Sequence, residues 1–161
     1  MSMLDFIRKS PENGRRSTPK LISEENGLMG VNDELNQYVE YYMESIRMKS
    51  KGVVLIVEDD LFFRHIVESA IKEYSRDITI HTSTSVDGAL KILETAPVDL
   101  VISDYYLEGT GTGLDLCRKV LSVYPKTKCV MMSNMGFYKY QEVASQTESS
   151  PEFMEKPITP S

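Results

Sequence analysis

The chain has 161 residues, of which 41% are hydrophobic and 26% are charged, a composition typical of a soluble globular domain with an extension. No apolar run approaches the roughly 20 residues that cross a bilayer, and the N-terminus lacks the apolar region of a signal peptide, so we expect a cytoplasmic protein without membrane insertion. The net charge of −6 lies entirely in residues 52–161, which argues against nucleic acid as a direct partner.

The first third of the chain divides into an irregular part and a helix. Residues 1–30 are rich in proline, glycine and polar residues with little periodic apolarity, so we expect them to be disordered or irregular. Residues 31–51 form an amphipathic segment whose pattern predicts a helix over Asn32–Lys49. Its apolar stripe consists of Leu35, Val39, Tyr42 and Ile46. Two heptads are too few to indicate a coiled coil, so this stripe should pack on its own domain or on a partner.

Strands and helices alternate from Gly52 onward. Val53–Val57 is apolar on both faces, as are parallel strands buried between two helix layers. Four further strands are predicted at Ile78–Thr82, Val98–Asp104, Cys129–Met132 and Glu152–Glu155. Five strands that alternate with helices predict an α/β domain over residues 52–161, built on a doubly wound parallel sheet with right-handed crossovers.

The two cysteines of the chain, Cys117 and Cys129, match no disulfide or metal motif. We therefore expect two reduced side chains that act as small buried hydrophobes.

Four of the five predicted strands end in polar groups of related chemistry. The first ends at Glu58 and Asp59, the third at Asp104, the fourth at Ser133 and the fifth at Lys156. In an open α/β sheet, ligands bind at this end of the strands. Carboxylates gathered there repel one another unless a cation such as Mg2+ lies among them. Aspartate is also a competent nucleophile for an aspartyl phosphate, whose oxygens an ammonium and a hydroxyl can bind.

Each of these residues has an ordinary structural explanation when it is taken alone. One member of the Asp59–Asp60 pair fits a helix N-cap, and Asp104 fits a loop cap. Lys156 fits a solvated surface lysine, and Ser133 fits a turn residue. The ordered set outweighs these explanations for every residue except Ser133, for which the two interpretations stay balanced.

The motifs, in this order, resemble the receiver domain of bacterial two-component response regulators. The resemblance is carried by Val54–Asp60, by Val98–Asp104 with Gly113–Leu116, and by Phe153–Pro157. It covers about two thirds of the chain. The resemblance implies a flavodoxin-like fold with strand order 2-1-3-4-5.

The resemblance implies a phosphoryl-transfer role for these residues. Asp104 would be the phosphoacceptor, and Lys156 would hold the phosphoryl group. Mg2+ would be bound by Asp104 and Asp59, by Glu58 through water, and by the backbone carbonyl of Tyr106.

The resemblance also implies a conformational switch. The hydroxyl of Ser133 would bond to the phosphoryl group and pull the loop after the fourth strand inward. Phe153 stands at the family's rotating aromatic position, and its motion would follow that of Ser133.

The chain departs from the family pattern most clearly at its end. It stops at Ser161, soon after Pro157, where a receiver normally continues into a fifth helix that covers one face of the sheet. We expect that fifth helix to be absent and the predicted Asn32–Lys49 helix to fill its place, in cis or by exchange between two chains. The alternative is a truncated sequence whose N-terminal helix is a dimerisation or partner-binding arm.

We interpret the chain as a single-domain response regulator that takes phosphate on Asp104 from a histidine kinase or phosphotransfer protein. It would act through contacts with a downstream protein whose identity the sequence does not reveal, with no enzymatic activity beyond slow self-dephosphorylation. Asn134, the long loop at 107–113 and the expected absence of the fifth helix motivate an alternative, a receiver-fold scaffold that phosphorylation does not regulate. A hydrolase of the haloacid dehalogenase type is disfavoured because Tyr106 stands where a second aspartate is needed.

Overall fold

The computed structural model of the protein describes residues 31–45, 51–145 and 151–156. The elements are, in chain order, α2 (Val31–Ser45), β1 (Gly52–Val57), α3 (Leu61–Tyr74), β2 (Ile78–Ser83), α4 (Val86–Thr95), β3 (Leu100–Ser103), α5 (Gly113–Val123), β4 (Lys128–Ser133), α6 (Phe137–Ala144) and β5 (Glu152–Glu155). The five predicted strands are therefore found close to their expected bounds, and helices alternate with them as predicted. The helix predicted over Asn32–Lys49 begins at Val31 as α2, and its expected end, with Ile46 of the stripe, lies outside the described residues. The expectation for residues 1–30 lies outside the described residues.

The five strands form one parallel sheet with the order β2-β1-β3-β4-β5. This order confirms the doubly wound, flavodoxin-like arrangement. Alternate residues of β1 point to opposite faces: Val54 and Ile56 enter one hydrophobic cluster, and Leu55 and Val57 enter the other. The uninterrupted apolar run of β1 thus reflects burial on both faces.

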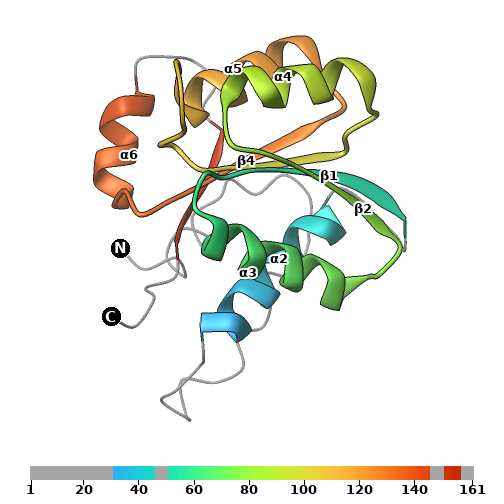
Figure 1. The fold of residues 1–161 in the computed structure, drawn as a ribbon. Coiled ribbons are helices and arrows are strands. Elements are labelled where there is room, and N and C mark those ends of the chain that lie inside the picture. Colours follow the sequence, from blue (N-terminus) through green and yellow to red (C-terminus); the bar gives the residue numbers. More distant parts are fainter. Residues whose placement is uncertain (1–30, 46–50, 146–150, 157–161) are drawn as a thin grey trace.

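Two helices cover each face of the sheet. Figure 1 shows α4 and α5 on one face and α2 and α3 on the other, with α6 near the edge formed by β5. Over the described part of the chain, no helix combines the length and the apolarity that a membrane span needs.

Helix α2 is packed inside the domain. Its buried side chains are Leu35, Tyr38, Val39, Tyr42 and Met43, which share one cluster with residues of α3 and of the strands, including Met132 and Met154. The ring of Tyr42 lies 5.5 Å from the ammonium of Lys128 on β4, and Lys128 pairs with Glu152 of β5 at 2.9 Å. Burial and the Glu152 carboxylate hold the pKa of Tyr42 well above its usual value. Helix α2 therefore reaches β4 and β5 from beside α3.

The two cysteines correct one expectation. Cys117 of α5 and Cys129 of β4 form a disulfide, with Cα atoms 5.6 Å apart, a separation that suits this bond. Both side chains are buried in the cluster between α5 and the sheet. The spacing of the two cysteines does not predict the bond, because the contact depends on how α5 lies across β4.

Candidate functional site

The register of the sheet brings the predicted acidic residues together. Val57 of β1 pairs with Ser103 of β3, so the residues that follow them, Glu58 and Asp104, leave the sheet side by side. The carboxylate oxygens of Glu58, Asp59 and Asp104 lie within 4.8 Å of one another. Glu58 and Asp104 are buried, whereas Asp59 is exposed.

Lys156 follows β5 and lies between the two buried carboxylates. Its ammonium nitrogen is 2.7 Å from Oε2 of Glu58 and 3.1 Å from Oδ2 of Asp104. All three side chains are at least nine-tenths buried, an arrangement that is stable only when the charges are paired. Burial opposes the charge on Lys156, but its bond to Glu58 and the nearby Asp104 carboxylate raise its pKa overall. Burial raises the pKa of Glu58, and the Lys156 ammonium offsets part of that rise.

Asp104 is held at both carboxylate oxygens and at its backbone. Oδ1 accepts a 2.7 Å hydrogen bond from the amide of Tyr105, while Oδ2 accepts from Lys156. The backbone carbonyl accepts from the Ser103 hydroxyl at 2.9 Å. A Cβ at Gly113 would lie 1.8 Å from that carbonyl oxygen, so glycine is what lets α5 begin so close to Asp104.

The start of α3 completes the site on the side of Glu58. Asp60 is the N-cap: its Oδ1 accepts from the amide of Phe63 at 2.8 Å, and its own amide donates to Glu58 Oε1 at 3.0 Å. The ring of Phe63 lies under Lys156, with the ammonium 4.4 Å from the ring centroid. Phe63 was not among the predicted site residues, although an aromatic residue in the first turn of a helix that follows an acidic strand end is a usable signal.

The remaining predicted residues lie at or near the same end of the sheet. Ser133 is fully buried at the end of β4; its Oγ accepts from the amide of Met135 at 3.3 Å, and its carbonyl accepts from the Lys156 amide at 2.8 Å. Phe153 is buried in β5 and stacks on Tyr140 of α6, with centroids 4.3 Å apart and planes at 11°. The side chain of Tyr106 is exposed; the predicted Mg2+ ligand at this position is its backbone carbonyl.

The charge balance of the site fits a divalent cation. Three carboxylates meet there with a single contacting ammonium among the described residues, so negative charge is in excess. Hard oxygen ligands of this kind suit Mg2+.

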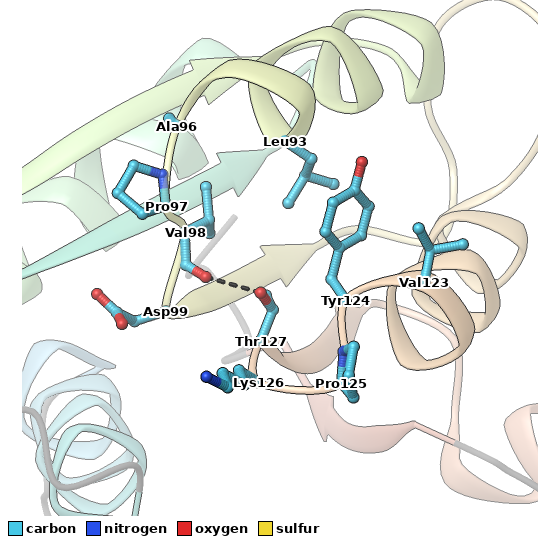
Figure 2. Close-up of a pocket in the computed structure, with 10 residues that line it drawn as sticks. All are labelled: Leu93, Ala96, Pro97, Val98, Asp99, Val123, Tyr124, Pro125, Lys126 and Thr127. Atoms are coloured by element: carbon cyan, nitrogen blue, oxygen red, sulfur yellow. Dashed lines mark hydrogen bonds between the residues drawn. The ribbon is translucent and has the colours of Figure 1, made fainter.

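The opposite end of the sheet contains a cavity and no buried ion pair among the described residues. It measures about 450 Å³ and lies where α4 and α5 end (Figure 2). Its lining consists of Leu93, Ala96, Pro97, Val98, Asp99, Val123, Tyr124, Pro125, Lys126 and Thr127. The hydroxyl of Thr127 donates to the carbonyl of Val98 at 2.7 Å, and Asp99 accepts from the amide of Val53 at 2.8 Å. Because Thr127 and Asp99 are bonded to backbone atoms, we assign them a structural role. The candidate site is therefore the end of the sheet that holds Glu58, Asp104 and Lys156, called the charged end below.

Comparisons with known proteins point to one family. The family model described as the response regulator receiver domain matches residues 54–161. A stretch of 78 residues, 48% of the chain, is 36% identical to a protein-glutamate methylesterase/protein-glutamine glutaminase of Paramagnetospirillum magneticum, and the match spans 22% of that protein's length.

Solved structures show the same fold. The signal receiver domain of an HD domain-containing protein from Pseudomonas fluorescens is 20% identical, with a TM-score of 0.58 over 70% of this chain and 80% of that chain. The response regulator TrrA from Thermotoga maritima, solved in complex with Mg2+-BeF, is also 20% identical, with a TM-score of 0.55 over 67% of this chain and 89% of that chain.

Proposed function

The chain belongs to the response regulator receiver domain family, and on that premise we propose that Asp104 accepts a phosphoryl group in two-component signalling. The observation that carries the proposal is the buried contact of Lys156 with Asp104 and Glu58. A buried lysine between two carboxylates costs free energy to maintain. Such an arrangement is expected where an ammonium must stand beside a nucleophile.

The proposed step is an in-line transfer from a phosphohistidine of a histidine kinase or phosphotransfer protein. A P–O bond forms between a carboxylate oxygen of Asp104 and phosphorus while the P–N bond of the donor breaks. The P–N electron pair stays on the ring nitrogen, and the donor leaves as neutral imidazole with a proton on its other nitrogen. Tyr105 and Lys156 hold the acceptor carboxylate in place, so the protein contributes chiefly positioning and charge neutralisation.

The metal site of this proposal consists of Glu58, Asp59, Asp104 and the backbone carbonyl of Tyr106. Mg2+ bound there would neutralise negative charge on the phosphoryl oxygens. Lys156 would bind a phosphoryl oxygen from the opposite side, because its ammonium already contacts the acceptor oxygen.

Ser133 and Phe153 form the proposed switch. In the present state the Ser133 oxygen accepts a hydrogen bond from Met135, so its O–H can donate to a phosphoryl oxygen. Such a donation would draw in the loop after β4. Phe153 would have to leave its stacked partner Tyr140, whose hydroxyl is bonded to the carbonyl of Pro151. The switch therefore has a defined resting contact.

We also propose that α2 fills in cis the place expected for a fifth helix. The burial of its stripe against α3, together with the contacts of Tyr42 at β4 and β5, supports this arrangement.

Met43 is fully buried, so Met43→Ala should lower the free energy of unfolding by about 2–5 kcal/mol. In cis, the unfolding midpoint does not change with protein concentration; a midpoint that rises with concentration indicates exchange of α2 in a dimer.

Binding of a phosphate mimic tests the proposed phosphoacceptor. With Mg2+ and beryllofluoride, the wild-type chain should give a bound 19F NMR signal that Asp104→Asn abolishes. Absence of the bound signal, or a signal that survives in Asp104→Asn, would favour the alternative of a receiver-fold scaffold that phosphorylation does not regulate.

A further inference from the structure

The ammonium of Lys156 is enclosed on three sides. Glu58 and Asp104 approach it at 2.7 and 3.1 Å, and the ring of Phe63 lies at 4.4 Å. Two of these neighbours are carboxylates of the proposed metal site, whereas the third is uncharged and belongs to a helix.

We propose that Phe63 is a positioning residue, whose ring face keeps the Lys156 ammonium at Asp104 when Glu58 engages a cation. This inference rests on the proposed phosphoacceptor function. A desolvated ammonium over an aromatic face is attracted by the electron-rich centre of the ring. Because the ring contributes no strong acceptor, it does not compete with phosphoryl oxygens for the lysine N–H groups.

The ring is well fixed for this role. Phe63 lies in the first turn of α3, and its amide is bonded to the N-cap Asp60, which in turn is bonded to Glu58. Its side chain is only 5% exposed and lies in the cluster that joins α3 to the sheet. The position of the ring is therefore set by the core and does not require the ion pair between Glu58 and Lys156.

The neighbouring Phe62 provides a matched control. It is the same residue type on the same helix, but it is 66% exposed. Phe62→Leu removes an aromatic ring without touching the environment of Lys156. Phe63→Leu removes the ring face and keeps an apolar side chain in the core, and Phe63→Tyr keeps an aromatic ring at this position.

The contact can be tested in the metal-free protein by NMR of the lysine side chains. The Hε resonances of Lys156, assigned with Lys156→Arg, should be shifted upfield by the ring current of Phe63. This shift should disappear in Phe63→Leu and persist in Phe63→Tyr and Phe62→Leu. An unshifted wild-type resonance, or a shift retained in Phe63→Leu, overturns the proposal.

The functional effect can be tested by the rate of phosphorylation with acetyl phosphate and Mg2+, followed by intact mass. Phe63→Leu should slow the reaction about tenfold, as expected for loss of one desolvated cation–π contact, whereas Phe63→Tyr should stay within about twofold of wild type. In a Lys156→Met background, Phe63→Leu should have no further effect, because its action passes through the lysine.

The outcomes separate this inference from the function on which it rests. A wild-type chain that acetyl phosphate and Mg2+ do not phosphorylate contradicts both. A wild-type chain that is phosphorylated, with Phe63→Leu equally fast or with equal slowing in the Lys156→Met background, overturns the role of Phe63 and leaves the phosphoacceptor in place.

Discussion

The polar side chains at the two ends of the parallel sheet have different bonding partners: they pair with one another at the carboxyl end and with backbone atoms at the amino end. At the carboxyl end, the buried Glu58, Asp104 and Lys156 form one ionic cluster. At the amino end, the cavity of about 450 Å³ is bordered by polar groups such as Thr127 and Asp99 that are bonded to backbone. We therefore propose that the chemistry of this domain takes place at the buried charges, which are held together at a cost in desolvation, and not at the cavity.

The chain direction explains the difference. Helices α3 and α5 begin at the carboxyl end of the sheet, where their capped N-termini favour negative charge. Helices α4 and α5 end beside the cavity. Because all five strands are parallel, their carboxyl ends meet at one edge of the sheet, and the predicted site residues lie at that edge.

The largest expected effect is on the phosphorylation rate, when one aspartate at each end of the sheet is replaced by asparagine. Asp104→Asn should abolish phosphorylation by acetyl phosphate, because an amide oxygen is a poor nucleophile. Asp99→Asn should leave the rate unchanged, because an amide oxygen can still accept the hydrogen bond from Val53. Intact mass spectrometry of the two variants and of the wild type measures the extent of phosphorylation in each. Equal loss in the two variants would remove the distinction between the ends.

Removal of one lysine at each end should affect stability unequally. Lys156→Met leaves Glu58 and Asp104 buried without their cation, and loss of one partner from a buried ion pair costs about 3–5 kcal/mol. We expect urea denaturation of the metal-free protein to show a loss of that size, which Mg2+ partly restores. Lys126→Met, at the exposed rim of the cavity, should change the free energy of unfolding by less than about 0.5 kcal/mol. A Lys156→Met protein as stable as wild type would contradict the assignment of a buried charge cluster.

Ser133→Ala should have a smaller effect, on rate more than on fold. It removes a proposed hydrogen bond to a charged phosphoryl oxygen, so phosphorylation should slow about tenfold. The rate is measured by intact mass against time at fixed phosphodonor concentration. An unchanged rate would assign Ser133 to the turn at the end of β4, which its bond with Met135 already supports.

The smallest expected effect is at the amino end. Thr127→Val removes the hydroxyl that donates to Val98, which should cost about 1 kcal/mol of unfolding free energy. The phosphorylation rate should not change. A slower rate with normal stability would indicate that the cavity communicates with the charged end.

The sequence predicted which residues lie at the carboxyl end of the sheet, but it did not predict the side-chain contacts around them. The apolar run of β1 and the polar residues that follow it place Glu58 and Asp59 at a strand end, and parallel topology then brings Asp104 and Lys156 near them. The ring of Phe63 beneath Lys156 and the Cys117–Cys129 disulfide were missed. These contacts depend on how helices rotate and slide on the sheet, which periodicity does not specify.

The most direct measurement locates the phosphoryl group on the chain. After treatment with acetyl phosphate and Mg2+, borohydride reduction converts an aspartyl phosphate to homoserine, which peptide mass spectrometry can place. We predict homoserine at position 104 alone, dependent on Mg2+ and absent in the untreated chain. Homoserine at another aspartate, or none in a protein that retains its fold, would contradict the assignment of Asp104 as the phosphoacceptor.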